Sequence, residues 1–290
     1  MREEILTFGE NGEIVGIRTQ GEQASEIAPS SSTSAFSNKP MVLLSHAGLL
    51  HRVGPYRQWV DLARLLSNDG FSVFRFDFNG LRDGDMSNDS ISDTTQPIND
   101  FVNVMNYLEK NHGAKHFIII GLCSGADIGY FVTVADKRVV GIILMEGFGY
   151  RTMGWYVRHY LPLDVRKWKN RFRSLFRRLR KHLKASCVSI SNQAFLDLAN
   201  NQDLRNFPSQ EQAQTEIQQL VDRGVDMLFI YSSGAAEYLN YANQFHAMLP
   251  KLELNDKIQV QFYPEADHMF TLLEHRAKLH ESIRRWMQRF

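Results

Sequence analysis

A cysteine and a histidine stand at the two places in this chain where side chains could carry out covalent chemistry. Cys123 is the centre of Gly121-Leu122-Cys123-Ser124-Gly125, a pattern of the form Gly-x-nucleophile-x-Gly. The run 117–120 before it is typical of a strand, and a helical pattern begins at Ala126. A strand-to-helix turn of this form holds its middle residue on a strained tip, and the positive end of the helix lowers the pKa of a thiol. The pattern therefore predicts that Cys123 is a nucleophile.

Other interpretations of this segment stay open. Free cysteines are often small, buried hydrophobic residues, and a Gly-x-Cys-x-Gly pattern alone is a weak signal. The hydroxyl of Ser124 lies one position beyond the tip, which makes it a poorer candidate nucleophile. The backbone N–H of Ser124, in contrast, is placed to donate to an oxyanion. We expect a second donor from an amide near Gly48 or Leu49, in the loop after a strand predicted over 41–45.

The candidate base is His268, which ends the run Phe262-Tyr263-Pro264-Glu265-Ala266-Asp267-His268. Ten histidines occur, and only this one lies in the loop after the last predicted strand, downstream of the nucleophile. A thiol and an imidazole at these positions can ionise as a stable pair. The order of residues therefore predicts that Cys123 and His268 act together.

The acid of a catalytic triad has two candidates. It is expected after a strand over 226–231, where the chain reads Ser232-Ser233-Gly234-Ala235-Ala236-Glu237, with alanines at the expected positions and Glu237 one or two residues late. Glu146, at the end of a strand predicted over 139–145, offers another route to the imidazole. Either carboxylate could instead cap a helix or face solvent. A cysteine needs this acid less than a serine does, because the acid mainly orients the ring of a histidine that is already charged.

Strands and helices alternate along the chain in a way that would bring these residues together. A hairpin over 4–19 precedes a Ser-rich loop, and buried strands and amphipathic helices alternate from Pro40 onward. The pattern predicts a fold of the α/β class, with a mostly parallel sheet flanked by helices. The predicted strands cover 41–45, 71–76, 116–120, 139–145, 226–231 and 257–263, and the predicted helices cover 56–66, 98–110, 126–135, 237–249 and 271–288.

The alternation stops for nearly eighty residues, so we expect a helical cap insertion over 148–224 between two core parts, 1–147 and 225–290. Residues 151–184 carry twelve Lys and Arg against one acid, while the whole chain has a net charge of +1. Within this segment, residues 171–184 read as an amphipathic basic helix. It could dock on the core, or it could bind an anionic partner: membrane lipid, an acidic helix of an acyl carrier protein, or an acidic saccharide.

Composition narrows the possible protein classes, cellular locations and partners. The 290 residues are 43% hydrophobic and 22% charged, which is ordinary for a globular protein, and no apolar run approaches the roughly 20 residues of a membrane span. The start lacks the features of a secretory signal, and two cysteines do not build a disulfide framework. We expect a cytoplasmic protein, which the basic segment could bring to the inner membrane surface. A near-neutral charge without a base-reading motif argues against nucleic acid, and no cofactor or metal is expected.

Several segments are similar to the bacterial hydrolases associated with exosortase A systems. The similarity runs from about Pro40 to the C-terminus and includes the Gly121-Leu122-Cys123 turn and the Arg-rich segment. The other similar stretches are His51-Arg52-Val53-Gly54-Pro55-Tyr56-Arg57-Gln58, Leu62-Ala63-Arg64, Phe74-Arg75-Phe76-Asp77 and Pro264-Glu265-Ala266-Asp267-His268.

The resemblance implies an α/β-hydrolase fold and a hydrolase or acyl-transfer role near exopolysaccharide or envelope biosynthesis. Two segments depart from the family pattern. Where the family has an Asp after Ser-Gly-Asn, this chain has Ser233-Gly234-Ala235-Ala236. The family's Gly-x-Gly-Asp-Ser reads Gly80-Leu81-Arg82-Asp83-Gly84-Asp85-Met86-Ser87 here, which is longer and alters the rim of the expected site.

These observations support one leading hypothesis and two alternatives. In the leading hypothesis, Cys123 attacks an ester or thioester of a small acyl substrate, and the acyl-enzyme passes its acyl group to water or to an acceptor. The enzyme would then be an esterase, a thioesterase or an acyltransferase. The first alternative is a catalytically degenerate protein of the same fold that binds through its basic cap. The second is a serine hydrolase that uses Ser124.

Overall fold

The computed structural model describes residues 1–9, 14–21, 39–45, 51–78, 95–160, 207–253 and 255–290. Its centre is an eight-stranded sheet in the order β1-β2-β4-β3-β5-β6-β7-β8. β1 and β2 form the predicted hairpin, β2 pairs antiparallel with β4, and the other pairs are parallel. The strands are β1 (Arg2–Phe8), β2 (Ile14–Gln20), β3 (Met41–Ser45), β4 (Val73–Phe76), β5 (Phe117–Leu122), β6 (Val139–Met145), β7 (Asp226–Ser232) and β8 (Ile258–Tyr263).

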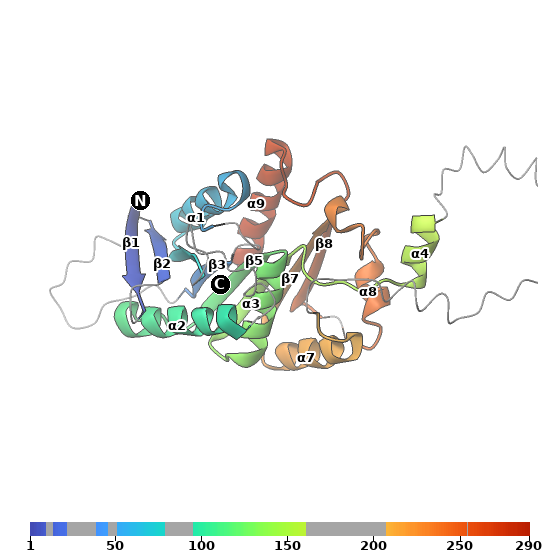
Figure 1. Cartoon of the computed structure of the whole chain (residues 1–290), viewed down its shortest axis with the longest axis horizontal. Coiled ribbons are helices and arrows are strands. Elements are labelled where there is room, and N and C mark those ends of the chain that lie inside the picture. Colours follow the sequence, from blue (N-terminus) through green and yellow to red (C-terminus); the bar gives the residue numbers. More distant parts are fainter. Residues whose placement is uncertain (10–13, 22–38, 46–50, 79–94, 161–206, 254) are drawn as a thin grey trace, which may run out of the picture.

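Helices cover both faces of this sheet (Figure 1). On one face lie α1 (Gln58–Asn68) and α9 (Leu273–Met287), which contact each other. On the other lie α2 (Thr95–His112), α3 (Ser124–Ala135) and α7 (Gln210–Asp222). This arrangement confirms the predicted α/β class and its mostly parallel sheet.

The central strand β5 is held from both faces. Ile118 and Ile120 pack in the cluster under α1 and α9, whereas Phe117 and Ile119 pack in the cluster under α2, α3 and α7. Complete burial of one such side chain is worth about 1.5–3 kcal/mol, so β5 is among the best-fixed parts of the molecule. The turn that follows β5 therefore starts from a rigid base.

One predicted helix is largely absent. Instead of a helix over 237–249, the structure has a short 3-10 turn, η3 (Ser233–Ala235), and a five-residue helix, α8 (Gln244–Met248). The buried side chain of Gln244 explains the difference. Its Nε2 donates to the carbonyls of Tyr150 and Tyr238, and its Oε1 accepts from the N–H of Asn240. Two of these bonds satisfy backbone groups of Tyr238 and Asn240, which lie within the predicted helix.

The segment between β6 and β7 is described at its two ends. At its C-terminal end, α7 packs Ala213, Ile217 and Leu220 into the same cluster as α2 and α3, so this helix covers the core sheet. Residues 161–206 lie outside the described residues, and the predicted basic helix falls among them. No helix in the described part of the chain is both long and apolar enough to cross a bilayer.

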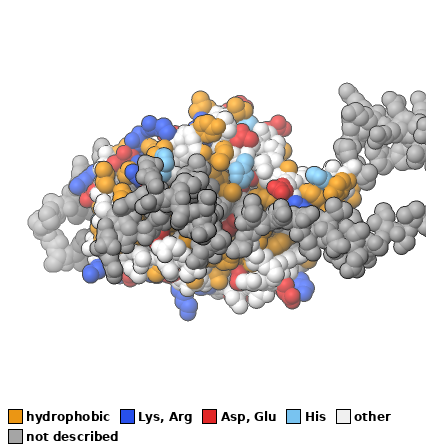
Figure 2. Space-filling model, viewed as in Figure 1, with side chains coloured by type: hydrophobic (Ala, Val, Ile, Leu, Met, Phe, Trp, Pro, Cys, Tyr) orange, Lys and Arg blue, Asp and Glu red, His pale blue; other side chains and the backbone are white. Residues whose placement is uncertain are grey.

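At the other end of this segment, α4 (Met153–Tyr160) projects from the body of the molecule (Figure 1). Trp155 docks it, with Nε1 donating to the carbonyl of Ala236 at 2.9 Å. Met153, Val157 and Tyr160 are exposed on the same helix. Figure 2 shows hydrophobic side chains gathered on this end of the molecule. The helix is thus attached to the loop after β7 and leaves an apolar stripe uncovered.

Candidate active site

Cys123 forms the tip of the turn between β5 and α3. Its φ of 55° and ψ of −123° lie in a region that residues other than glycine rarely occupy. Its N–H donates to the carbonyl of Met145 at 2.8 Å, and its carbonyl accepts from the N–H groups of Ala126 and Asp127. These bonds hold the strained backbone in place, so the thiol stands at the positive end of α3.

Gly121 explains the spacing of the motif around Cys123. A Cβ atom on Gly121 would lie 2.4 Å from the carbonyl oxygen of Gly125 and 2.6 Å from the Cα of Ala126. Such distances are shorter than van der Waals contact, and the atoms involved are backbone atoms that cannot turn aside. Strand and helix therefore meet this closely only with a glycine at position 121.

His268 follows β8 in a loop that lies against η3. A Cβ atom on Gly234 would lie 2.3 Å from the backbone nitrogen of His268, so the two loops touch at backbone level. The N–H and the hydroxyl of Ser233 both donate to the carbonyl of Ala266, at 3.1 and 2.6 Å. The loop after β7, which lacks a well-placed acid, instead supports the loop that carries His268.

The imidazole of His268 contacts both Cys123 and Glu146. Hydrogen bonds with Cys123 and then with Glu146 raise the pKa of His268 from 6.5 to about 9, against the opposing effect of burial. Nδ1 of the ring lies 3.4 Å from Oε2 of Glu146, which leaves Nε2 for the thiol. The geometry thus favours a protonated imidazole at neutral pH, as a thiolate–imidazolium pair requires.

Glu146 follows β6 directly and is completely buried. Its backbone is also strained, with a φ of 53°, and it is held by two hydrogen bonds. The N–H of Glu146 donates to the carbonyl of Ile230 at 2.8 Å, and its carbonyl accepts from the hydroxyl of Tyr238 at 3.1 Å. A buried carboxylate is costly unless a cation lies beside it, and the protonated ring of His268 is such a cation.

Glu237, the other candidate acid, lies in a different environment. Its side chain is 67% exposed, and its Oε1 lies 3.9 Å from a guanidinium nitrogen of Arg151. The contacts recorded for the described residues link His268 to Glu146 and link Glu237 to Arg151. The two candidate acids are therefore placed differently: the turn after Ala235 carries Glu237 outward beside Arg151, whereas Glu146 lies beside His268.

Of the two predicted donors of the oxyanion hole, one lies within the described residues and the other does not. Ser124 is the first residue of α3, so its N–H lies at the positive end of the helix. Gly48 and Leu49 lie outside the described residues, and the second donor stays a prediction.

The sequence did not predict one contact near this loop. The N–H of Arg52 donates to Oδ1 of Asp77 at 2.6 Å, and its guanidinium binds Oδ2, which ties the residue to the end of β4.

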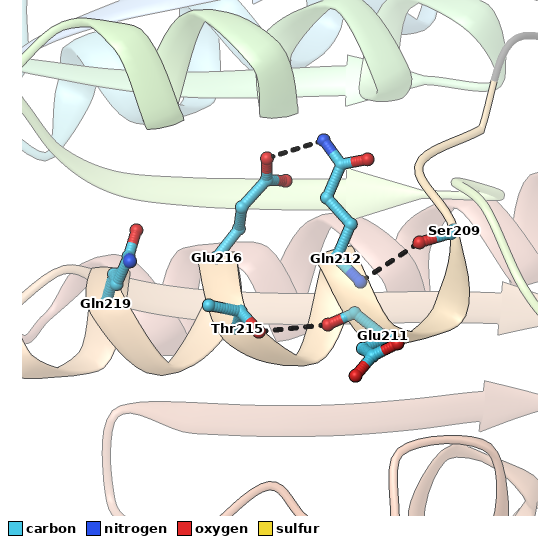
Figure 3. Close-up of a pocket in the computed structure, with 6 residues that line it drawn as sticks. All are labelled: Ser209, Glu211, Gln212, Thr215, Glu216 and Gln219. Carbon is cyan, nitrogen blue, oxygen red and sulfur yellow. Dashed lines mark hydrogen bonds between the residues drawn. The ribbon is translucent and has the colours of Figure 1, made fainter.

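A shallow hollow of about 580 Å³ lies elsewhere, along α7 (Figure 3). Some of its polar side chains already bond with one another or with the core: Glu216 accepts from Gln212 and from the hydroxyl of Tyr130. The lining residues are Ser209, Glu211, Gln212, Thr215, Glu216 and Gln219. None of them is a predicted site residue. The residues that could carry out covalent chemistry lie around Cys123 instead.

Neither a family model nor a curated protein matches this sequence. Solved structures do match it. A dienelactone hydrolase from Anabaena variabilis superposes with a TM-score of 0.59 at 11% identity, covering 100% of this chain and 98% of that one. An esterase from Pyrococcus furiosus gives 0.60 at 12% identity, with 100% and 91% covered. The chain has the α/β-hydrolase fold.

An acylaminoacyl peptidase from Pyrococcus horikoshii also matches, with a TM-score of 0.55 at 13% identity, covering 99% of this chain and 41% of that one. Identities this low show a shared fold and leave the chemistry to be argued from the site. In the α/β-hydrolase fold the nucleophile follows a strand and begins a helix, and the histidine comes last in the chain. Cys123 and His268 occupy these places. The finer resemblance to exosortase-associated hydrolases stays a prediction.

Proposed function

We propose that this chain is a cysteine hydrolase or acyltransferase that acts on an ester or thioester through a covalent acyl-enzyme. The observation that carries the proposal is the contact of one imidazole, His268, with both the thiol of Cys123 and the buried carboxylate of Glu146. A structural cysteine has no need of such a partner, whereas a nucleophile does.

The proposed reaction begins with the thiolate–imidazolium pair. Sγ of Cys123 attacks the carbonyl carbon, and the negative charge passes to the carbonyl oxygen, which the N–H of Ser124 stabilises. The tetrahedral intermediate collapses, and His268 gives its proton to the departing alcohol or thiol. The product is a thioester between the acyl group and Cys123, with a neutral imidazole beside it.

The second half of the reaction regenerates the pair. Water or an acceptor attacks the thioester and loses its proton to His268, after which the bond to Sγ breaks and the thiolate returns beside the imidazolium. Glu146 holds Nδ1 throughout, so that Nε2 faces the reacting atoms. Hydrolysis and transfer differ in whether the acyl-enzyme meets water or another acceptor first.

The partners of this chemistry are also proposals. The acyl donor is a small molecule or an acyl group on a carrier protein, and the basic residues between 151 and 184 attract the acidic carrier or an anionic membrane surface. A cytoplasmic location at or near the inner membrane fits both donors.

Mass spectrometry of the intact protein tests the proposal. After brief incubation with p-nitrophenyl esters of short and long acyl chains, the wild-type chain is expected to carry one acyl group on Cys123, or to release acid continuously. Cys123→Ala and His268→Ala should abolish both, while Cys187→Ser, the matched change at the other cysteine of the sequence, should leave both intact. No adduct and no turnover with any donor would overturn the proposal.

The alanines at the usual acid position favour one alternative, a degenerate protein that binds without chemistry. It predicts an unmodified Cys123 with every donor and salt-sensitive binding to anionic vesicles. The other alternative, in which Ser124 is the nucleophile, predicts full turnover by Cys123→Ala. The same set of variants therefore separates all three hypotheses.

A further inference from the structure

Asp267, the residue before His268, is bonded to the chain on the far side of the histidine. Its Oδ1 accepts from the N–H of Met269 at 2.9 Å and from the N–H of Thr271 at 3.1 Å. The same oxygen accepts from the hydroxyl of Thr271 at 3.1 Å. The carbonyl of Asp267 also accepts from the N–H of Phe270 at 3.0 Å. One residue thus closes a tight turn around His268.

This turn contains a strained residue that needs such support. Phe270 has a φ of 51°, in the left-handed region, and its ring is completely buried. A residue of this kind costs of order 1–3 kcal/mol and persists only where its surroundings hold it. The buried ring fixes one end of the turn, and the bonds to Asp267 fix the other.

The charge of Asp267 suits this role. Burial raises the pKa of its carboxyl, but the hydrogen bonds from the amides of Thr271 and Met269 outweigh that effect, and the net pKa is below the ordinary value. The carboxylate is therefore ionised at neutral pH, which strengthens each bond that it accepts.

We propose that Asp267 is a positioning residue: it fixes the backbone of His268 so that the imidazole meets Cys123 and Glu146 together. The inference rests on the proposed function of the Cys123–His268 pair. It adds a second restraint to the one already described, since Glu146 orients the ring through Nδ1 whereas Asp267 orients the chain that carries the ring. Without Asp267, the turn loses the bonds to Met269 and Thr271, and the imidazole drifts from the thiol.

The test measures ionisation of Cys123 directly and needs no knowledge of the natural substrate. The rate of alkylation of Cys123 by iodoacetamide is followed by mass spectrometry as a function of pH, since only the thiolate reacts. In the wild-type chain, reactivity is expected to persist well below the ordinary thiol pKa of about 8.5. In Asp267→Ala the profile should shift toward that value, and the rate near neutral pH should fall by about tenfold, because misplacement of a positioned group is costly.

Three further variants separate positioning from general loss of structure. Asp267→Asn keeps Oδ1, which accepts three of the bonds, but loses the charge, and should shift the profile much less than Asp267→Ala does. Thr271→Val removes the single hydroxyl bond and should shift the profile slightly in the same direction as Asp267→Ala. Glu265→Ala removes a neighbouring carboxylate from the same loop and should change nothing. The melting temperature of every variant is recorded alongside.

The outcomes distinguish this inference from the function on which it rests. An ordinary thiol profile in the wild-type chain, with no acyl adduct, would overturn the proposed function and the inference with it. A wild-type profile that is shifted to low pH and is unchanged in Asp267→Ala and Thr271→Val would overturn the inference alone. A profile equally disturbed in Asp267→Asn and Asp267→Ala would also overturn it, because the acceptor oxygen would then not be what matters.

Discussion

The carboxylate of Glu146 reaches His268 from the end of β6, with 3.4 Å between Oε2 and Nδ1. β6 lies beside β5 in the sheet, so the thiol and the carboxylate follow two adjacent parallel strands. Both Cys123 and Glu146 have positive φ values, 55° and 53°, and the N–H of Cys123 bonds to the residue just before Glu146. Two strained strand ends thus stand side by side with the imidazole between their side chains.

Glu146→Gln tests the role of this carboxylate. The amide keeps the size of the side chain but loses the charge, so we expect kcat to fall by about tenfold with KM unchanged. The loss should be far smaller than the roughly 10⁴-fold loss seen when a serine protease loses its triad acid. Glu237→Gln is the matched control and should leave kcat intact. Equal losses in the two variants would contradict the assignment of Glu146.

Cys123→Ser tests why the chain uses a thiol. A serine hydroxyl does not ionise against an imidazolium and depends more on the acid, so we expect much lower activity than with cysteine. In this background Glu146→Gln should cost a larger factor than in the native one, a non-additivity that a double-mutant cycle measures. Strict additivity of the two changes would show that the nucleophile and the acid are not coupled through His268.

The raised pKa of His268 predicts how stability varies with pH. The pKa rises from 6.5 to about 9 on folding, so protonation favours the folded state. The contribution of His268 is fully present below about pH 6.5 and is lost as the pH rises through about 9. Denaturant unfolding of the wild type and of His268→Gln, from about pH 6 to about pH 10, should show a difference in the free energy of unfolding that shrinks with pH. A difference that stays constant or grows would contradict this prediction.

Gly234→Ala tests the contact between the two loops. The added methyl would lie 2.3 Å from the nitrogen of His268, so the histidine must move. We expect kcat to fall by about 10²-fold, since a shift of about 1 Å in a catalytic group has an effect of that size. Gly70→Ala is the control: its φ of 89° strains an alanine, but the space around it is open. It should lower the melting temperature and leave kcat unchanged, whereas a parallel loss of activity would point to stability as the common cause.

The parts of the fold that sequence predicted well rest on local signals. The apolar run of β5, the small residues beside Cys123 and the helical pattern from Ala126 onward all lie within twenty residues, and the structure has the strand, turn and helix that they indicate. The place of His268 followed from strand order alone. In each of these cases the residues that indicate the structural element are the residues that form it.

The parts that sequence left open depend on contacts between distant segments. Whether Glu146 or Glu237 faces His268 depends on the backbone conformation at the ends of β6 and β7. The sequence pattern around these residues does not indicate that conformation. The missing helix after β7 depends on the side chain of Gln244, which bonds to Tyr150 some ninety positions away in the sequence. The support that Gly234 gives to His268 is likewise visible only when the two loops are brought together.

The placement of the acid on β6 has a consequence for how the protein matures on the ribosome. Cys123 and Glu146 both precede the long segment between β6 and β7, whereas His268 follows it. A nascent chain that has reached that segment therefore carries the thiol and the carboxylate without the imidazole of His268. Under the proposed mechanism, the cysteine becomes a strong nucleophile only after β8 has joined the sheet. The order of the three residues would then delay the reactivity of the thiol until the surrounding fold is in place.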